Sequence, residues 1–174
     1  MPEWTLGPGT GMLRVLTTRE GLAAKAGHDL VMEVGAWEAT LTLGDAAALE
    51  LTADPGSIEV VSGHGGAKPL SDRDRREIRK TIAGKVLGSA PIVFRSTAVT
   101  GGDDGQWVVT GDLELAGTSA PAAFDLHVAG DGALRAEATV TQTRWGIKPY
   151  SGLMGALKVA DDVRLEVEAR LPPG

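Results

Sequence analysis

WEATLTL, residues 37–43, alternates apolar and polar side chains without a break. The same alternation returns in residues 107–115, 122–128, 134–140 and 163–170. Successive side chains of a β-strand point to opposite faces, so each of these segments has one apolar face and one polar face. One-sided strands of this kind are typical of an antiparallel sheet with a single covered face. The sequence therefore predicts an all-β, antiparallel fold.

Shorter strand candidates lie between these segments, separated by turn residues. They cover residues 11–18, 47–53, 57–61 and 92–100. Gly101–Gly105 and Gly130–Gly132 join neighbouring runs at hairpin length, and Asp54–Gly56 marks another turn. The inward parity changes at Gly35, so we expect a β-bulge there.

One segment, residues 71–87, breaks the alternation. Its apolar residues Ile78, Ile82 and Val86 are spaced by four, and Ser71 is a suitable N-cap. We therefore expect one amphipathic helix over about residues 71–87. Its many charges are interpreted as a solvated face rather than as a landing site for an anionic partner.

About eight amphipathic strands cannot form an open sheet without exposing its edges. Closure into an up-and-down barrel of about eight strands is therefore expected, with a two-sheet sandwich as the alternative. A chain of 174 residues is of a size that favours one domain, which we place over residues 1–174.

The interior of such a barrel either fills with side chains or holds one small ligand. Only seven aromatic residues are available to fill it. Several inward positions carry small residues, namely Ala39, Gly111, Ala122, Ala136, Ala138 and Ala169. Small inward residues leave volume for a ligand, or they allow tighter packing, and both interpretations stay open.

The composition excludes several classes of function. With 17 Lys and Arg against 23 Asp and Glu, the net charge is −6, which argues against sequence-independent binding of nucleic acid. The absence of cysteine excludes disulfides, Cys-based zinc sites and thiol catalysis. The chain shows neither a basic, apolar leader nor an apolar run long enough for a transmembrane segment, so we expect a soluble, cytoplasmic protein.

Candidate reactive groups are few. The three histidines His28, His64 and His127 have no second histidine at metal-ligand spacing, and no G-x-S-x-G motif is present. His28 precedes Asp29, where a structural, hydrogen-bonded role is favoured over catalysis. We therefore expect no catalytic residue, no metal and no cofactor.

Arg144 and Gln142 continue the inward parity of Val140. An arginine that points inward needs an anion or water, because an unpaired buried charge is costly. Arg144 would pair with a barrel carboxylate or meet the polar head of an apolar ligand at the barrel mouth. Parity selects the ligand-binding candidates Trp37, Leu41, Trp107, Val109, Phe124, Leu126, Val140, Arg144 and Leu165.

Five short motifs occur in the order KAGHDL (residues 25–30), KPLSDRD (68–74), APIVFRS (90–96), GDLELAG (111–117) and RWGI (144–147). Together they resemble the YceI-like family over about residues 10–171. The resemblance implies an extended, lipocalin-like antiparallel barrel that binds a polyisoprenoid chain in an apolar tunnel. It also implies a possible homodimer, since members are often dimeric.

The chain departs from the family pattern at three places. It shows no signal peptide like that of exported members. It has Ser89-Ala90 where an aromatic residue usually precedes the Pro-x-x-Phe motif, and Ser119-Ala120-Pro121 where Thr-Lys-Pro is usual. The expected function is a carrier or sequestering protein for an isoprenoid-like ligand. The alternatives are a cavity enzyme that uses His28 or Arg144, and a filled structural barrel.

Overall fold

The computed structural model describes residues 3–20, 29–64, 70–152 and 157–172. Its first elements are β1 (Glu3–Leu6), β2 (Gly11–Thr17), β3 (Arg19–Glu20), β4 (Asp29–Val34), β5 (Trp37–Thr42), β6 (Ala48–Ala53), η2 (Pro55–Ser57), β7 (Ile58–His64), α1 (Asp72–Thr81) and the π-helical turn η3 (Ile82–Val86). The remaining elements are β8 (Ile92–Gly101), η4 (Asp103–Gly105), β9 (Gln106–Leu115), β10 (Thr118–Val128), β11 (Ala133–Thr141), η5 (Gln142–Trp145), β12 (Ser151–Gly152), β13 (Leu157–Val159) and β14 (Asp162–Arg170).

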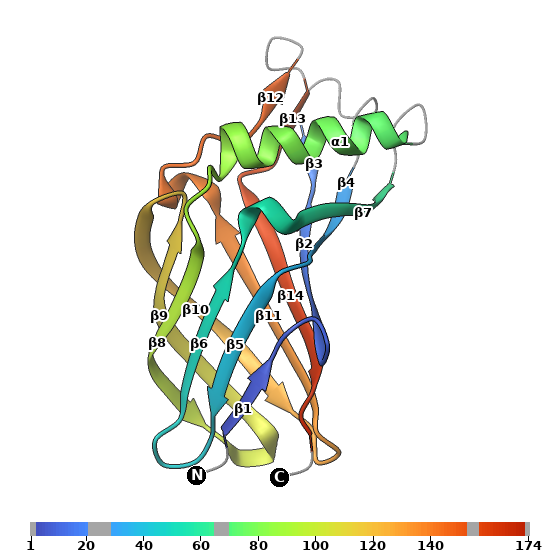
Figure 1. Cartoon of the computed structure of the whole chain (residues 1–174). Helices are drawn as coiled ribbons and strands as arrows, with labels where there is room; N and C mark the ends of the chain where they lie inside the picture. Colours follow the sequence, from blue (N-terminus) through green and yellow to red (C-terminus); the bar gives the residue numbers. More distant parts are fainter. Residues whose placement is uncertain (1–2, 21–28, 65–69, 153–156, 173–174) are drawn as a thin grey trace.

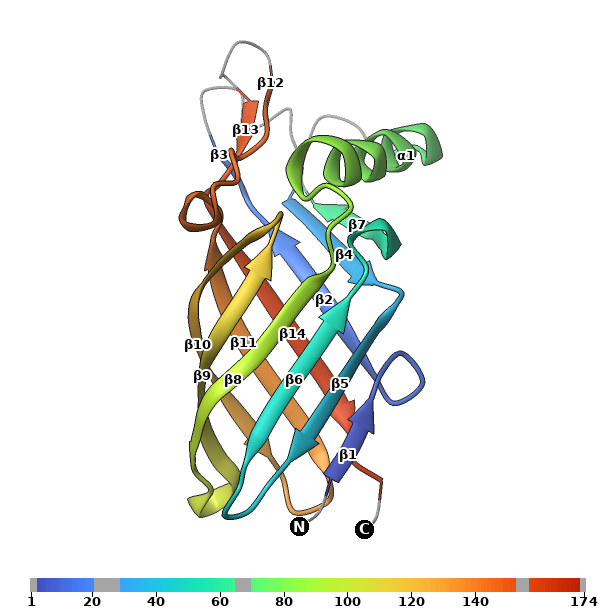
Figure 2. The ribbon, with the colours of Figure 1, turned by 60° about the vertical axis from the view of Figure 1, so that its left-hand side comes forward.

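Eleven strands form one antiparallel sheet in the order β1-β5-β6-β8-β9-β10-β11-β14-β2-β4-β7. A second, small sheet has the order β12-β13-β3. The large sheet curls into the barrel-like wall of Figures 1 and 2, with α1 across its upper end and both chain ends at its lower end. The prediction of an all-β, antiparallel, barrel-like fold with one α-helix is therefore confirmed for the described part of the chain.

The expected number of about eight strands does not match the eleven in the sheet, because two long strands are broken by corners. Gly35 and Ala36 separate β4 from β5, and Asp54 with η2 separates β6 from β7. Across the corners, the Gly35 amide donates to the Ser57 carbonyl and the Asp54 amide donates to the Ala36 carbonyl, both at 3.0 Å. The β4–β7 pair thus continues the β5–β6 pair, and β1 adds an extra strand beside β5.

The β-bulge expected at Gly35 is wrong, since that residue lies in the first corner. Inward-facing Val34 and Trp37 flank two exposed residues there, and this explains the change of parity. The register shifts lie elsewhere, at Val31/Met32 between β4 and β7 and at Ser96/Ala98 between β8 and β9.

The helix begins as the sequence predicts. The Asp74 amide donates to Ser71 Oγ, and the Ser71 amide donates to Asp74 Oδ2, each at 3.1 Å, so the two residues form a capping box. The expected range 71–87 is covered by α1 and η3 together. Arg79 ties the helix to the β7 side of the barrel, because its guanidinium binds Glu59 at 3.2 Å and donates to the Gly56 carbonyl at 3.0 Å.

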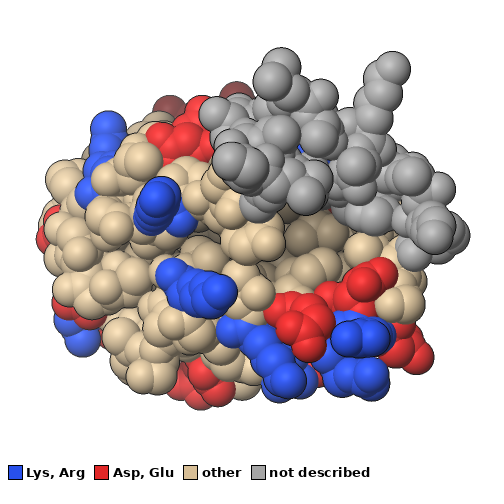
Figure 3. All heavy atoms as spheres, turned by 90° about the horizontal axis from the view of Figure 1, so that it is seen from above, with Lys and Arg blue, Asp and Glu red and all other residues tan. Residues whose placement is uncertain are grey.

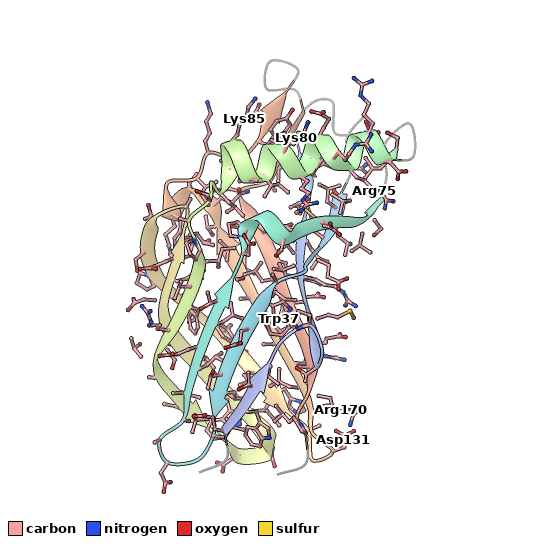
Figure 4. All side chains as sticks on the ribbon, in the orientation of Figure 1. Trp37, Arg75, Lys80, Lys85, Asp131 and Arg170 are labelled. Atoms are coloured by element: carbon pink, nitrogen blue, oxygen red, sulfur yellow. The ribbon has the colours of Figure 1, made fainter. Side chains whose placement is uncertain are left out.

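The outer side of α1 is charged and exposed, as the sequence predicts. Lys80 and Lys85 project away from the barrel (Figure 4). Among the described residues, no helix is long and apolar enough to cross a membrane.

Candidate functional site

A cavity of about 650 Å³ lies inside the curled sheet beneath α1. Each of the eleven strands of the large sheet contributes at least one lining side chain, and most of these side chains are apolar. Binding sites for small molecules are usually apolar hollows of about 300–1,000 Å³ with a few polar groups. The cavity therefore has the size and chemistry of a ligand site.

Inward-facing side chains show that this cavity is open rather than filled. Phe124, Leu165 and Val167 all point inward and line the cavity, yet each is only half-buried. A core side chain covered by neighbours would be fully buried, as Val109 is, with 0% exposure. Of the two interpretations that the sequence left open, the structure supports unfilled volume.

Two of the sequence candidates do not line the cavity. Val109 is completely buried and contributes to the packed core. Trp107 lies near the β8–β9 hairpin, where a Cβ atom on Gly102 would approach its ring to 2.9 Å. Neither residue lines the cavity, so parity alone does not separate lining residues from packing residues.

The helix forms the roof of the cavity. Ile78, Ile82 and Val86 line the cavity, and none of the α1 or η3 residues is fully buried. Their apolar face thus covers open volume instead of a packed core. The four-residue spacing of these apolar residues predicts the helix but carries no signal that the helix covers a cavity.

Polar side chains collect at the α1 end of the cavity. Asp74 and Glu77 come from α1, Gln142 from η5, Arg19 from β3, and Tyr150 from the segment before β12. Viewed from this end, charged side chains gather along the helix (Figure 3). An apolar interior with a polar rim suits a molecule with a long apolar body and one polar end.

The structure brings six of the nine candidates together at the cavity. These are Trp37, Leu41, Phe124, Leu126, Val140 and Leu165. Trp37 lies in the wall at the start of β5, immediately after the first corner (Figure 4).

The prediction that Arg144 points inward is wrong. Strand β11 ends at Thr141, and the chain coils into η5, which changes the direction of the following side chains. Arg144 is exposed there and makes no ion pair within the described ranges. Gln142 is the polar residue that is buried at the cavity, and its Nε2 donates to the Ala160 carbonyl at 3.1 Å.

The RWGI motif adds one lining residue, Ile147, that parity does not predict, and Trp145 holds this part of the chain in place. The Trp145 ring is buried, and its Nε1 donates to the Leu113 carbonyl at 2.7 Å, which fixes η5 against β9. Ile147 follows and lines the cavity. The apolar residues of the RWGI motif were the available signal.

The structure brings few reactive groups together. His28 lies outside the described residues, and His127 is half-buried on β10, next to Arg135 in register. Within the described ranges, no three His, Cys, Asp or Glu side chains converge as metal ligands would. On the outer face, the hydrogen bond from Arg164 to Glu166 (2.6 Å) and the charge of Glu137 raise the pKa of Arg164.

Together, the curled antiparallel sheet, its roof helix and its apolar cavity define a small β-barrel of the ligand-enclosing class. The chain belongs to the YceI-like domain family, whose sequence pattern matches residues 17–171. No curated protein matches it.

Solved structures share this fold. BcnA of Burkholderia cenocepacia superposes with a TM-score of 0.67 at 15% identity, covering 91% of this chain and 94% of that one. A polyisoprenoid binding domain from Saccharophagus degradans, implicated in plant cell wall breakdown, has a TM-score of 0.56 at 7% identity, with 93% and 94% covered. A CJ YceI protein gives 0.60 at 14% identity, with 82% and 85% covered.

Proposed function

We propose that this protein binds a long, apolar, isoprenoid-like molecule in the barrel cavity and carries or sequesters it. The observation that carries the proposal is the open apolar cavity to which all eleven strands of the large sheet contribute. A filled structural barrel would not leave Phe124, Leu165 and Val167 half-exposed on its inner face. The similarity in fold to a polyisoprenoid binding domain supports the same class of ligand.

The proposed contacts follow from the lining. The apolar chain would lie against Trp37, Phe124 and Leu165, above the buried Leu41 and Leu126. Its polar end would lie beside the polar side chains at the α1 end. Among the lining residues that the structure describes, no set resembles a nucleophile, a base and an orienting group, so we propose a binding protein rather than an enzyme.

Organic extraction of the purified protein, followed by mass spectrometry, tests the proposal. We expect an isoprenoid-like lipid in near-stoichiometric amount after expression in a host that makes such lipids. Repeated absence of any apolar ligand from several hosts, together with no uptake of added isoprenoid alcohols, would contradict it.

Affinity for linear isoprenoid alcohols is expected to rise with chain length until the cavity is full. Each buried CH₂ group contributes about 0.8 kcal/mol, so each added isoprene unit strengthens binding by at least about tenfold. Titration of Trp fluorescence with farnesol, geranylgeraniol and longer alcohols measures this series. Because the interaction is apolar, added salt should change Kd little, and an affinity that does not change with chain length would contradict a tunnel.

The possible homodimer and the cytoplasmic location are two further predictions. Light scattering on the purified protein measures its molar mass and therefore tests the possible homodimer. Fractionation of the source cells tests the cytoplasmic location.

A further inference from the structure

The wall of the barrel is interrupted between β10 and β11. Their paired register runs from Val128↔Leu134 to Asp125↔Glu137 and stops there. Both strands continue beyond this point, since β10 pairs with β9 back to Thr118 and β11 pairs with β14 as far as Thr141. Each strand therefore keeps its other neighbour while the seam between the two opens.

The cavity reaches this seam. In a closed wall only every second residue of a strand can face the interior. On the other described strands of the large sheet, the lining residues are never consecutive, but on β11 the five successive residues from Ala136 to Val140 all line the cavity. Side chains of both parities can do so only where the cavity extends round the edge of the strand.

Pro121 gives the seam a cause in the sequence. The Ala129 amide donates to the Ala133 carbonyl at 2.8 Å, so the odd-numbered residues of β10 direct their backbone groups toward β11. Pro121 belongs to this set and has no N–H to donate. Proline is tolerated on a strand edge that lacks a partner, and the edge of β10 that faces β11 is of that kind.

The opening has defined borders. Residues 121–124 of β10 and 138–141 of β11 form its sides, which corresponds to about 13 Å of strand at about 3.3 Å per residue. The pair Asp125↔Glu137 closes it below. Above it, η5 crosses toward β9, where the Trp145 ring is hydrogen-bonded to the Leu113 carbonyl. We call this opening the side window.

We propose that the side window between β10 and β11 is the passage by which the apolar ligand enters and leaves the cavity. The inference rests on the proposed function. The competing passage would run beneath α1, which the two contacts of Arg79 with Glu59 and Gly56 fasten to the β7 side of the barrel. Phe124 and Val140 line the cavity from the two sides of the window and would contact a chain that passes through it.

A reversible cross-link across the window tests the proposal. The chain has no cysteine, so Ala123→Cys with Thr139→Cys introduces the only thiols, at two exposed positions that face each other if the β10–β11 register is extended. If they do not oxidise directly, a bis-maleimide whose short spacer contains a disulfide joins them, and mass spectrometry verifies the link. The probe is all-trans-retinol, a fluorescent isoprenoid alcohol, and stopped-flow fluorescence follows its release to phosphatidylcholine vesicles.

We expect the link to slow release by at least about tenfold. The Kd for retinol should change little, because the link slows uptake and release by the same factor. Reduction of the disulfide should restore the original rate. The matched control is His127→Cys with Arg135→Cys, which links the same strands below the window, where they are already paired, and should leave the rate unchanged.

A third variant, Glu59→Cys with Arg79→Cys, fastens α1 to β7 and examines the competing passage. An unchanged release rate in the fully linked 123/139 variant would overturn the proposal. Slowing by the 59/79 link alone would place the passage beneath α1 and would overturn it as well. Failure of the proposed function has a different signature, because the unaltered protein would then take up neither retinol nor longer isoprenoid alcohols.

Discussion

Val167→Glu is expected to weaken binding of an isoprenoid alcohol by at least about 100-fold, because a bound apolar chain would strip water from the new carboxylate. Val167 lies on β14 between Leu13 of β2 and Ala136 of β11, and its side chain lines the cavity. The open volume in front of it leaves room for the longer side chain and for water in the unliganded protein. Titration with geranylgeraniol measures the loss of affinity.

The control is the same substitution on the outer face. Val108 of β9 is 49% exposed, so Val108→Glu adds the same charge outside the barrel. Its affinity for geranylgeraniol should equal that of the unaltered protein. Thermal unfolding of both variants establishes that each is folded. Equal affinities for the two folded variants would show that the ligand does not occupy the cavity.

Gly111→Ala is expected to reduce the free energy of unfolding by about 1–3 kcal/mol through overpacking. Gly111 is buried on β9, and a Cβ atom there would lie 2.7 Å from Ser96 Cα and 2.8 Å from Phe94 Cζ. It would come closer still to the Arg95 carbonyl oxygen. Because Phe94 packs against Phe124 with ring centroids 5.3 Å apart, displacement of its ring would also disturb the cavity wall.

Differential scanning calorimetry measures this effect, with Tm falling by about 2–4 °C for each kcal/mol in a chain of this size. Gly84→Ala is the matched control. Gly84 lies in the π-helical turn, and no heavy atom lies within 4 Å of the position of its Cβ, so alanine there should be neutral or slightly stabilising. An unchanged Tm for Gly111→Ala would show that β8 can shift away from this position at no cost.

Gly111 also shows where composition misleads. Its small size suggested free volume, but the Phe94 ring and the β8 backbone occupy the space beside it. Ala122 and Ala138 do line the cavity, as their inward parity predicts. Residue size therefore does not distinguish a gap from a close contact, because the neighbouring strand decides which one forms.

The wrong direction predicted for Arg144 and the wrong number of strands share one physical cause. Period-two alternation identifies the face of a side chain only while the chain stays extended. The corner at Gly35–Ala36 and the coil that begins at Gln142 both end that regularity, so inward parity could not be carried across them. Pro121 was the local signal for the side window, but its meaning depends on which neighbour its nitrogen faces, and that is a property of the sheet.

Local sequence patterns are enough to predict the antiparallel β-class, the hairpins, the capped amphipathic helix and the inward parity of most strands. These features follow from local periodicity, capping chemistry and turn residues, which act over a few neighbouring positions. Three features follow only from the assembled sheet: the interior stays open, α1 covers it, and the pairing of β10 with β11 ends near the polar end. Those features arise from register and packing between residues far apart in the chain, for which no short stretch of sequence carries a sufficient signal.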